Sequence, residues 1–176
     1  VILVSNEKNR DILLKKFSVD PNKIIIVADG VSIDKFLIDP EIVERLRNTY
    51  SLQKYRHRIV YCGTMNTLEG VDLLLQVVAE LSHLRKDFTL LLMGYPNVDY
   101  YRYAAERLGI ANIVSITGKI DYFNLFSYLS LGTSAISLKL PTSEGNLKVL
   151  NYAALGLPTF CFDHPSNRYI LGNHAI

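Results

Sequence analysis

The segment Phe88–Gly109 reads FTLLLMGYPNVDYYRYAAERLG, and it decides the fold class of the chain. Its first part, Phe88–Met93, is a nearly continuous apolar run, which is typical of a strand covered by helices on both faces of a parallel sheet. The following residues, Val98–Leu108, have a helical period, and Gly109 comes directly after them, where a left-handed backbone is favoured. A strand followed by such a helix predicts one βα unit of a parallel sheet.

The same alternation recurs on both sides of this segment. The predicted strands are Arg58–Cys62, Phe88–Met93, Ile113–Thr117, Ser134–Leu138 and Thr159–Phe162, and the predicted helices are Val71–Arg85, Val98–Leu108, Asp121–Leu131 and Gly145–Leu155. Gly132 and Gly156 are expected to end two of these helices as Gly109 does. Because crossovers between parallel strands are right-handed, we expect a doubly wound, Rossmann-like α/β sheet with strand order 3-2-1-4-5, counted from Arg58. Cys62 and Cys161 then lie on strands that are not neighbours, and we expect both to be reduced.

The first 55 residues follow a different pattern. We predict a helix over Glu7–Phe17, a strand over Lys23–Val27, a loop over Ser32–Pro40 and a helix over Glu41–Tyr50. The chain opens on an apolar, strand-like run with no initiator Met and no basic n-region. We therefore expect residues 1–55 to be the tail of a preceding domain with an interdomain segment, and residues 56–176 to be a second domain truncated at its C-terminus.

Composition excludes several classes of protein. The chain has 176 residues, of which 49% are hydrophobic, and its formal net charge is +2, with no run of Lys and Arg of the nucleic-acid-binding type. No apolar stretch approaches the roughly 18 residues of a membrane-spanning helix. No cysteine or histidine has metal-ligand spacing. We expect no nucleic-acid partner and no metal, and a cytoplasmic full-length protein, with peripheral membrane attachment left open.

Ligands of open α/β sheets bind outside the carboxyl ends of the strands. Four segments are predicted to lie there, namely Gly63–Gly70, Gly94–Asn97, Gly118–Asp121 and Lys139–Asn146. The first of them matches neither GxGxxG nor a P-loop, which argues against those two phosphate-binding motifs. Within it, Asn66 and Glu69 are spaced for a capping-box-like start to the next helix.

The segment Pro141–Asn146 joins a predicted strand to a predicted helix, which Ser143 can cap. The backbone N–H groups of Gly145, Asn146 and Leu147 would then be unpaired at the start of that helix and would suit a phosphate. Glu144 could accept hydrogen bonds from sugar hydroxyls, or it could merely complement the helix dipole. Spacing alone leaves both roles open.

Asn151 interrupts an apolar stripe that Leu147, Leu150 and Ala154 form on the same helix. A buried amide needs hydrogen-bond partners. These could be the hydroxyls of a ribose or a nearby carbonyl group, and the sequence does not choose between them.

Five segments, in their order and spacing, resemble motifs of the family-4 (group 1) retaining glycosyltransferases of the GT-B fold. They are Lys23–Phe36, Tyr61–Asp72, Leu91–Gly94, Leu108–Ile120 and Glu144–Pro158, and the resemblance that they carry extends over nearly the whole length of the chain. The chain is most similar to the C-terminal, donor-binding domain of that family. A receiver-type signalling domain is a poorer match, because Cys62-Gly63 and Thr117-Gly118 lack the acidic residues it needs.

The resemblance implies a nucleotide-diphosphate sugar as substrate, retention of anomeric configuration, and no metal or other cofactor. It implies that Glu144 contacts the donor sugar as the catalytic residue and that the backbone of Gly145, Asn146 and Leu147 holds phosphate. Gly63 and Thr64 would also face the donor, Gly118, Lys119 and Ile120 would lie beside the base, and Asn151 would stand where a glutamate holds the ribose. The family works in polysaccharide or glycolipid synthesis, with a sugar or lipid-linked acceptor on an N-terminal domain that this chain lacks. The isolated fragment is therefore expected to be inactive.

The sequence departs from the family at three positions. Thr64 stands in the place of a diphosphate-binding arginine, Glu69 in that of a lysine, and Asn151 in that of the ribose-binding glutamate. We expect a weakened donor site in which Glu69 repels the diphosphate and which Thr64→Arg with Glu69→Lys would strengthen. The alternative is a catalytically degenerate relative that serves as a binding or partner module.

Overall fold

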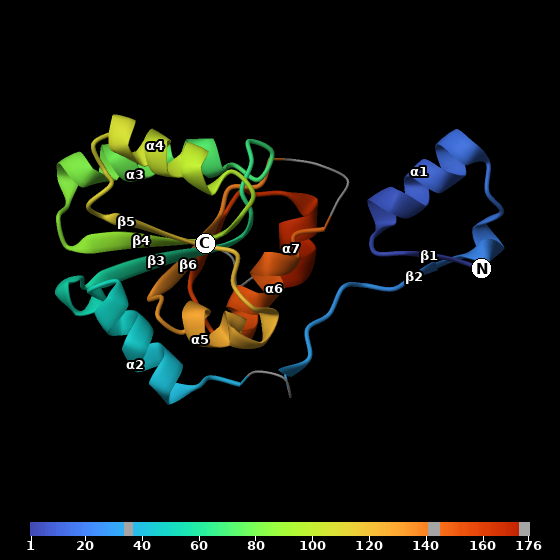
Figure 1. Ribbon diagram of the computed structural model, residues 1–176. Helices are drawn as coiled ribbons and strands as arrows, with labels where there is room; N and C mark the ends of the chain where they lie inside the picture. The colour runs from blue at the N-terminus through green and yellow to red at the C-terminus, as the bar shows by residue number, and fades with distance from the viewer. Residues whose placement is uncertain (34–36, 141–144, 173–176) are drawn as a thin grey trace.

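The computed structural model describes residues 1–33, 37–140 and 145–172. Its N-terminal unit consists of β1 (Ile2–Val4), α1 (Glu7–Phe17), the 3-10 turn η1 (Pro21–Lys23) and β2 (Ile24–Ile26). The two strands pair in parallel, and in Figure 1 the unit stands apart from the main sheet. Helix α1 begins where the Asn6 side chain accepts a hydrogen bond from the Asn9 amide at 2.9 Å, so its predicted bounds are confirmed.

Five parallel strands form the main sheet. They are β3 (His57–Thr64), β4 (Phe88–Tyr95), β5 (Val114–Gly118), β6 (Ser134–Ser137) and β7 (Thr159–Cys161), arranged in the order β5-β4-β3-β6-β7. This is the predicted order 3-2-1-4-5, and the α/β fold class is confirmed. Both cysteines are free, as expected from strands that are not neighbours.

Helices cover both faces of the sheet, as Figure 1 shows. Side chains of α3 (Val71–Leu84) and α4 (Val98–Arg107) pack into one buried cluster, and those of α2 (Pro40–Thr49), α5 (Leu125–Leu129) and α6 (Leu147–Ala154) pack into the other. The inner strand β4 contributes to both clusters and is buried from Phe88 to Gly94. Its continuous apolar run is therefore explained by burial on both faces.

The structure corrects several predicted bounds. The expected helix Asp121–Leu131 is a 3-10 turn, η4 (Tyr122–Asn124), followed by the short α5, and a further 3-10 turn, η3 (Leu52–Lys54), precedes β3. Helix α6 begins at Leu147, two residues later than predicted, with Asn146 at its N-cap. Ser143, the predicted cap, lies outside the described residues. The last helix, α7 (Pro165–Leu171), is absent from the sequence-based expectations.

Two of the three predicted glycine helix ends are confirmed. Gly109 and Gly156 have φ values of 69° and 66°, which place both in the left-handed region. The prediction for Gly132 is wrong, because its φ is not positive. Its role is close packing instead, since a Cβ at Gly132 would lie 2.8 Å from both γ-carbons of Val60. Among the described residues, no helix has the length and apolarity needed to cross a membrane.

Candidate functional site

A pocket of about 430 Å³ opens at the carboxyl ends of the parallel strands. Its lining comes from strand ends, loops and helices far apart in the sequence and comprises Cys62, Gly63, Thr64, Glu69, Met93, Gly94, Tyr95, Lys119, Ile120, Tyr122, Leu125, Lys139, Gly145, Asn146, Leu147, Lys148 and Asn151. Eight of the ten residues singled out from the sequence are brought together here. Gly118 ends β5 just outside the lining, and Glu144 lies outside the described residues.

A glycine allows the pocket wall to form at the end of β3. Gly63 has a φ of 145°, which side-chain-bearing residues rarely adopt, and a Cβ there would lie 2.8 Å from Cε of Lys148. The side chain of Lys148 therefore runs across the bare backbone of Gly63. Its Nζ lies 5.0 Å from the centre of the Tyr61 ring, within cation–π range.

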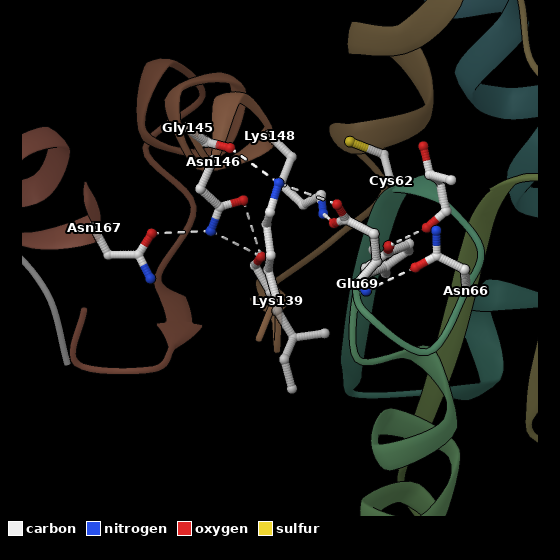
Figure 2. A network of polar contacts seen from close by, with 12 residues as sticks. Cys62, Asn66, Glu69, Lys139, Gly145, Asn146, Lys148 and Asn167 are labelled. Carbon is white, nitrogen blue, oxygen red and sulfur yellow. Dashed lines mark hydrogen bonds and ion pairs between the residues drawn. The ribbon is translucent and has the colours of Figure 1, made fainter. Parts of the chain in front are cut away.

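Glu69 is held by lysines rather than by a capping box. Its backbone N–H donates to Oδ1 of Asn66 at 2.8 Å, which confirms half of the expected motif. The carboxylate, however, points to the other side of the pocket, where Lys148 Nζ donates to Oε2 and Lys139 Nζ lies 3.2 Å from Oε1 (Figure 2). The expected reciprocal contact of the Glu69 side chain with Asn66 is therefore wrong.

The loop that carries Glu69 is pressed against the end of β6. Gly70 has a φ of 75°, and a Cβ there would lie 2.0 Å from the carbonyl oxygen of Leu138. The N–H of Leu140 donates to the carbonyl oxygen of Leu68 at 2.8 Å, which ties the two segments together. This close approach brings Glu69 within reach of Lys139.

The three charged side chains share one shielded environment. Their exposed fractions are 14% for Glu69, 11% for Lys139 and 9% for Lys148. Burial raises the pKa of Glu69, but the hydrogen bonds and charges of Lys148 and Lys139 outweigh it and hold that pKa below its usual value. Burial lowers the pKa of Lys148, and Glu69 offsets this only in part. Glu69 is thus an ionised carboxylate with two cations beside it, which removes the expected source of repulsion.

The side chain of Asn146 has a structural role. It is 4% exposed, and its Nδ2 donates to Ser137 Oγ at 3.1 Å and to Asn167 Oδ1 at 2.9 Å. Asn167 in turn donates to the carbonyl oxygen of Phe162 at 2.9 Å. Only the backbone of Asn146 is therefore left to meet a ligand, and Asn167, on the helix that sequence reasoning missed, supports it.

Asn151 has the opposite character. It is only 8% exposed and lines the pocket, yet its side-chain amide makes no hydrogen bond to the described part of the chain. The polar atoms of this amide keep some access to solvent. Of the two partners left open by the sequence, a nearby carbonyl is therefore not found among the described residues. The amide is available to a ligand in the pocket.

Aromatic side chains lie at the other end of the pocket. Lys119 Nζ lies 5.2 Å from the centre of the Tyr95 ring, and Tyr95 and Tyr122 are 53% and 58% exposed. Exposed rings of this kind can stack on a planar ligand. Sequence reasoning did not name either tyrosine, although Tyr95 lies within a segment predicted at the carboxyl edge and Tyr122 directly follows another.

A second pocket of about 480 Å³ lies between the N-terminal unit and α7, and Gly145 lines it as well as the first. Asn6, Asp29, His164 and Tyr169 are among its other lining residues. Within the described ranges, no three His, Cys, Asp or Glu side chains gather where they could hold a metal ion.

Comparisons with known proteins agree with the fold. The sequence profile of the family described as glycosyl transferases group 1 matches residues 56–176. The chain is 23% identical over 167 residues to D-inositol 3-phosphate glycosyltransferase 2 of Catenulispora acidiphila, a match that covers 89% of this chain and 38% of that protein.

Solved structures share the fold at low sequence identity. A glycosyltransferase from Rickettsia africae superimposes with a TM-score of 0.84 and 18% identity, covering 97% of this chain and 46% of that chain. Anabaena HepE in complex with UDP and glucose gives a TM-score of 0.80 and 12% identity, covering 96% of this chain and 46% of that chain. The chain thus spans less than half the length of each of these proteins.

Proposed function

The chain belongs to the family of group 1 glycosyl transferases, and from that premise we propose that it is the part of a glycosyltransferase that binds a nucleoside-diphosphate sugar. The donor lies in the 430 Å³ pocket at the carboxyl edge of the sheet. The full-length protein then transfers the sugar to a saccharide or lipid-linked acceptor in polysaccharide or glycolipid synthesis. The part that this chain lacks holds the acceptor.

The observation that carries this proposal is the side-chain amide of Asn151, which lines the pocket and has no hydrogen bond to the described part of the chain. The amide keeps some contact with solvent, so it can exchange its bonds to water for bonds to a ligand in the pocket. On an otherwise apolar helix face, an amide without a structural partner among the described residues favours such a ligand contact. The vicinal hydroxyls of a ribose both donate and accept hydrogen bonds, as the amide does.

The other lining residues indicate which part of the donor would lie at which end of the pocket. The backbone N–H groups at the start of α6, from Gly145 to Leu147, favour the phosphates. Tyr95, Tyr122 and Lys119 offer stacking and polar contacts to the base. Glu144, which precedes α6 in the sequence, is the proposed catalytic contact to the sugar. The UDP and glucose bound to HepE support a ligand of this class.

The alternative is a domain that has lost donor chemistry, and it depends on Thr64, Glu69 and Asn151. Two lysines contact the carboxylate of Glu69, and Asn151 lines the pocket with an amide that bonds to none of the described residues. Of the three positions, only Thr64 still favours a loss of donor binding, because it is exposed and supplies no positive charge. The balance of these observations favours a donor site.

Calorimetry with UDP, GDP and ADP, each beside its parent nucleoside, tests the proposal. We expect one diphosphate to bind in the high-micromolar to millimolar range and its nucleoside to bind more weakly. Adding EDTA should leave the affinity unchanged, because no metal is needed. If none of the three diphosphates binds or shifts the melting temperature of the folded chain, the proposed function is wrong.

A further inference from the structure

Two lysines of the pocket lie on the side opposite to the one where the family resemblance leads one to expect cations. The positions where the family resemblance leads one to expect cations, at the end of β3 and before α3, hold Thr64 and Glu69. The facing side carries Lys139, just after β6, and Lys148, in the first turn of α6. Both lysines line the pocket.

The two lysines are fixed by contacts that do not depend on a ligand. Lys139 Nζ donates to the carbonyl oxygen of Gly145 at 3.1 Å and lies 3.2 Å from Glu69 (Figure 2). Lys148 reaches the same carboxylate across the bare backbone of Gly63. A long side chain held in one place loses less conformational entropy when an anion binds.

We propose that Lys148, assisted by Lys139, is the cation that binds the diphosphate of the donor, and that Glu69 is a positioning residue that holds both ammonium groups at the pocket wall. This inference rests on the proposed function and assigns residues to it. It reverses the part expected of Glu69, from a repulsive group to a supporting one.

The charges and donors of the cluster fit this assignment. Two ammonium groups contact the single carboxylate of Glu69 at the pocket wall. An ammonium group has three N–H donors, so Lys148 can keep its bond to Glu69 and still donate to a phosphate oxygen. The three side chains are largely shielded from water, which strengthens the attraction for an anion that enters the pocket.

Lys148 is also adjacent to the proposed phosphate site in the chain. It follows Leu147, the last of the three residues whose backbone N–H groups are proposed to hold phosphate. One anion can therefore meet the start of α6 and the ammonium group together. Thr64 and Glu69 are then not needed as cations.

The test is calorimetry of the 176-residue chain with whichever of UDP, GDP and ADP binds the wild type best, at low and high salt. Lys148→Met should lower the affinity about tenfold to a hundredfold and flatten its salt dependence, while the affinity for the parent nucleoside stays the same. The charge-matched control is Lys86→Met, because Lys86 is exposed and precedes β4 at the opposite edge of the sheet. The control should bind within about twofold of the wild type.

Loss of Lys148 leaves Glu69 with one lysine fewer, so circular dichroism must first show that the variant folds. If it does not, the double variant Glu69→Gln with Lys148→Met removes both charges of the pair and should show the same loss of affinity. A folded Lys148 variant that binds the diphosphate as tightly as the wild type would overturn the inference but leave the proposed function standing. A wild-type chain that binds no diphosphate would overturn both.

Discussion

Lys139 Nζ lies 3.2 Å from Oε1 of Glu69, although three strands, three α-helices and their loops separate the two residues in the chain. The other carboxylate oxygen accepts from Lys148, so one side chain joins the turn before α3, the end of β6 and the first turn of α6. The same three segments line the pocket. Stability and ligand binding are therefore both expected to respond to changes at Glu69.

Glu69→Gln should make the free energy of unfolding less dependent on pH in the acidic range. Folding lowers the pKa of Glu69: burial raises it, but the lysine contacts outweigh that effect. Its ionised form therefore stabilises the fold fully above the unfolded pKa of about 4.3, and this contribution is lost as the pH falls through the lower folded pKa. At pH 7 we expect the variant to be about 1–2 kcal/mol less stable, since water at the pocket mouth screens the pair.

Urea denaturation at several pH values measures this difference. It should shrink toward zero once Glu69 is protonated in the folded wild type. Glu44→Gln is the control, because Glu44 faces Arg47 at 3.7 Å on an exposed surface and should differ by less than about 0.5 kcal/mol. A wild-type advantage that is equally large in acid would contradict the assigned cause.

Thr64→Arg and Glu69→Lys should act in opposite directions. Thr64 is exposed at the end of β3, so an arginine there adds a cation beside the pocket and should tighten diphosphate binding about tenfold. Glu69→Lys places a third ammonium group against Lys139 and Lys148 and removes their shared counter-charge. The double variant should therefore bind less tightly than Thr64→Arg alone, contrary to the expectation from the family resemblance. Calorimetry of all three variants decides, and a double variant that binds most tightly would refute the reasoning.

Two buried asparagines should respond differently to replacement by leucine. Asn151→Leu removes an amide that has no hydrogen bond to the described chain, so the free energy of unfolding should stay the same or rise by up to about 1 kcal/mol. Asn167→Leu breaks the hydrogen bonds to Asn146 and Phe162 and should cost about 1–3 kcal/mol. Diphosphate affinity should fall in the first variant despite its stability. Equal destabilisation of both variants would mean that Asn151 has a structural partner.

Tyr152→Phe should destabilise the centre of the sheet. The buried hydroxyl of Tyr152 accepts from the N–H of Cys62 at 2.9 Å, two residues beyond the point where the pairing of β3 with β6 ends. Its loss leaves that N–H without an acceptor, at a cost of about 1–3 kcal/mol in urea denaturation. Tyr55→Phe is the matched control, because its hydroxyl donates to Asn112 at 3.3 Å near the surface. If the two variants are equally stable, the hydroxyl of Tyr152 is not needed in the core.

The sheet could be predicted because short stretches of sequence identify its strands and the helices between them. The apolar run Phe88–Met93 needs burial on both faces, and the right-handed crossover rule limits the strand orders to a few, of which the predicted one is observed. Helix α7 could not be predicted in the same way. It has seven residues, too few to show a helical period, and it is tied to the rest of the chain through the distant Asn146.

The position of the site could be predicted, but its contacts could not. Topology alone places Gly63, Lys119 and Gly145 at one edge, and they line one pocket. The partners of Glu69 lie 70 and 79 residues further along the chain, and nothing in the local sequence indicates them. The local spacing favoured a capping box, and one of its two hydrogen bonds, from the Glu69 N–H to Asn66, is present. The Glu69 carboxylate instead contacts the two lysines, which attract it more strongly than the backbone N–H of Asn66 would.

The hydrogen bond between Asn146 and Asn167 bears on how far the chain can be shortened. The amide at the start of α6 donates to a residue of α7, 21 positions downstream. A chain that stopped after β7, although it would keep every strand of the sheet, would leave this amide with Ser137 alone. The minimal folding unit is therefore longer than the minimal sheet, and engineered fusions or deletions should preserve the sequence through Leu171.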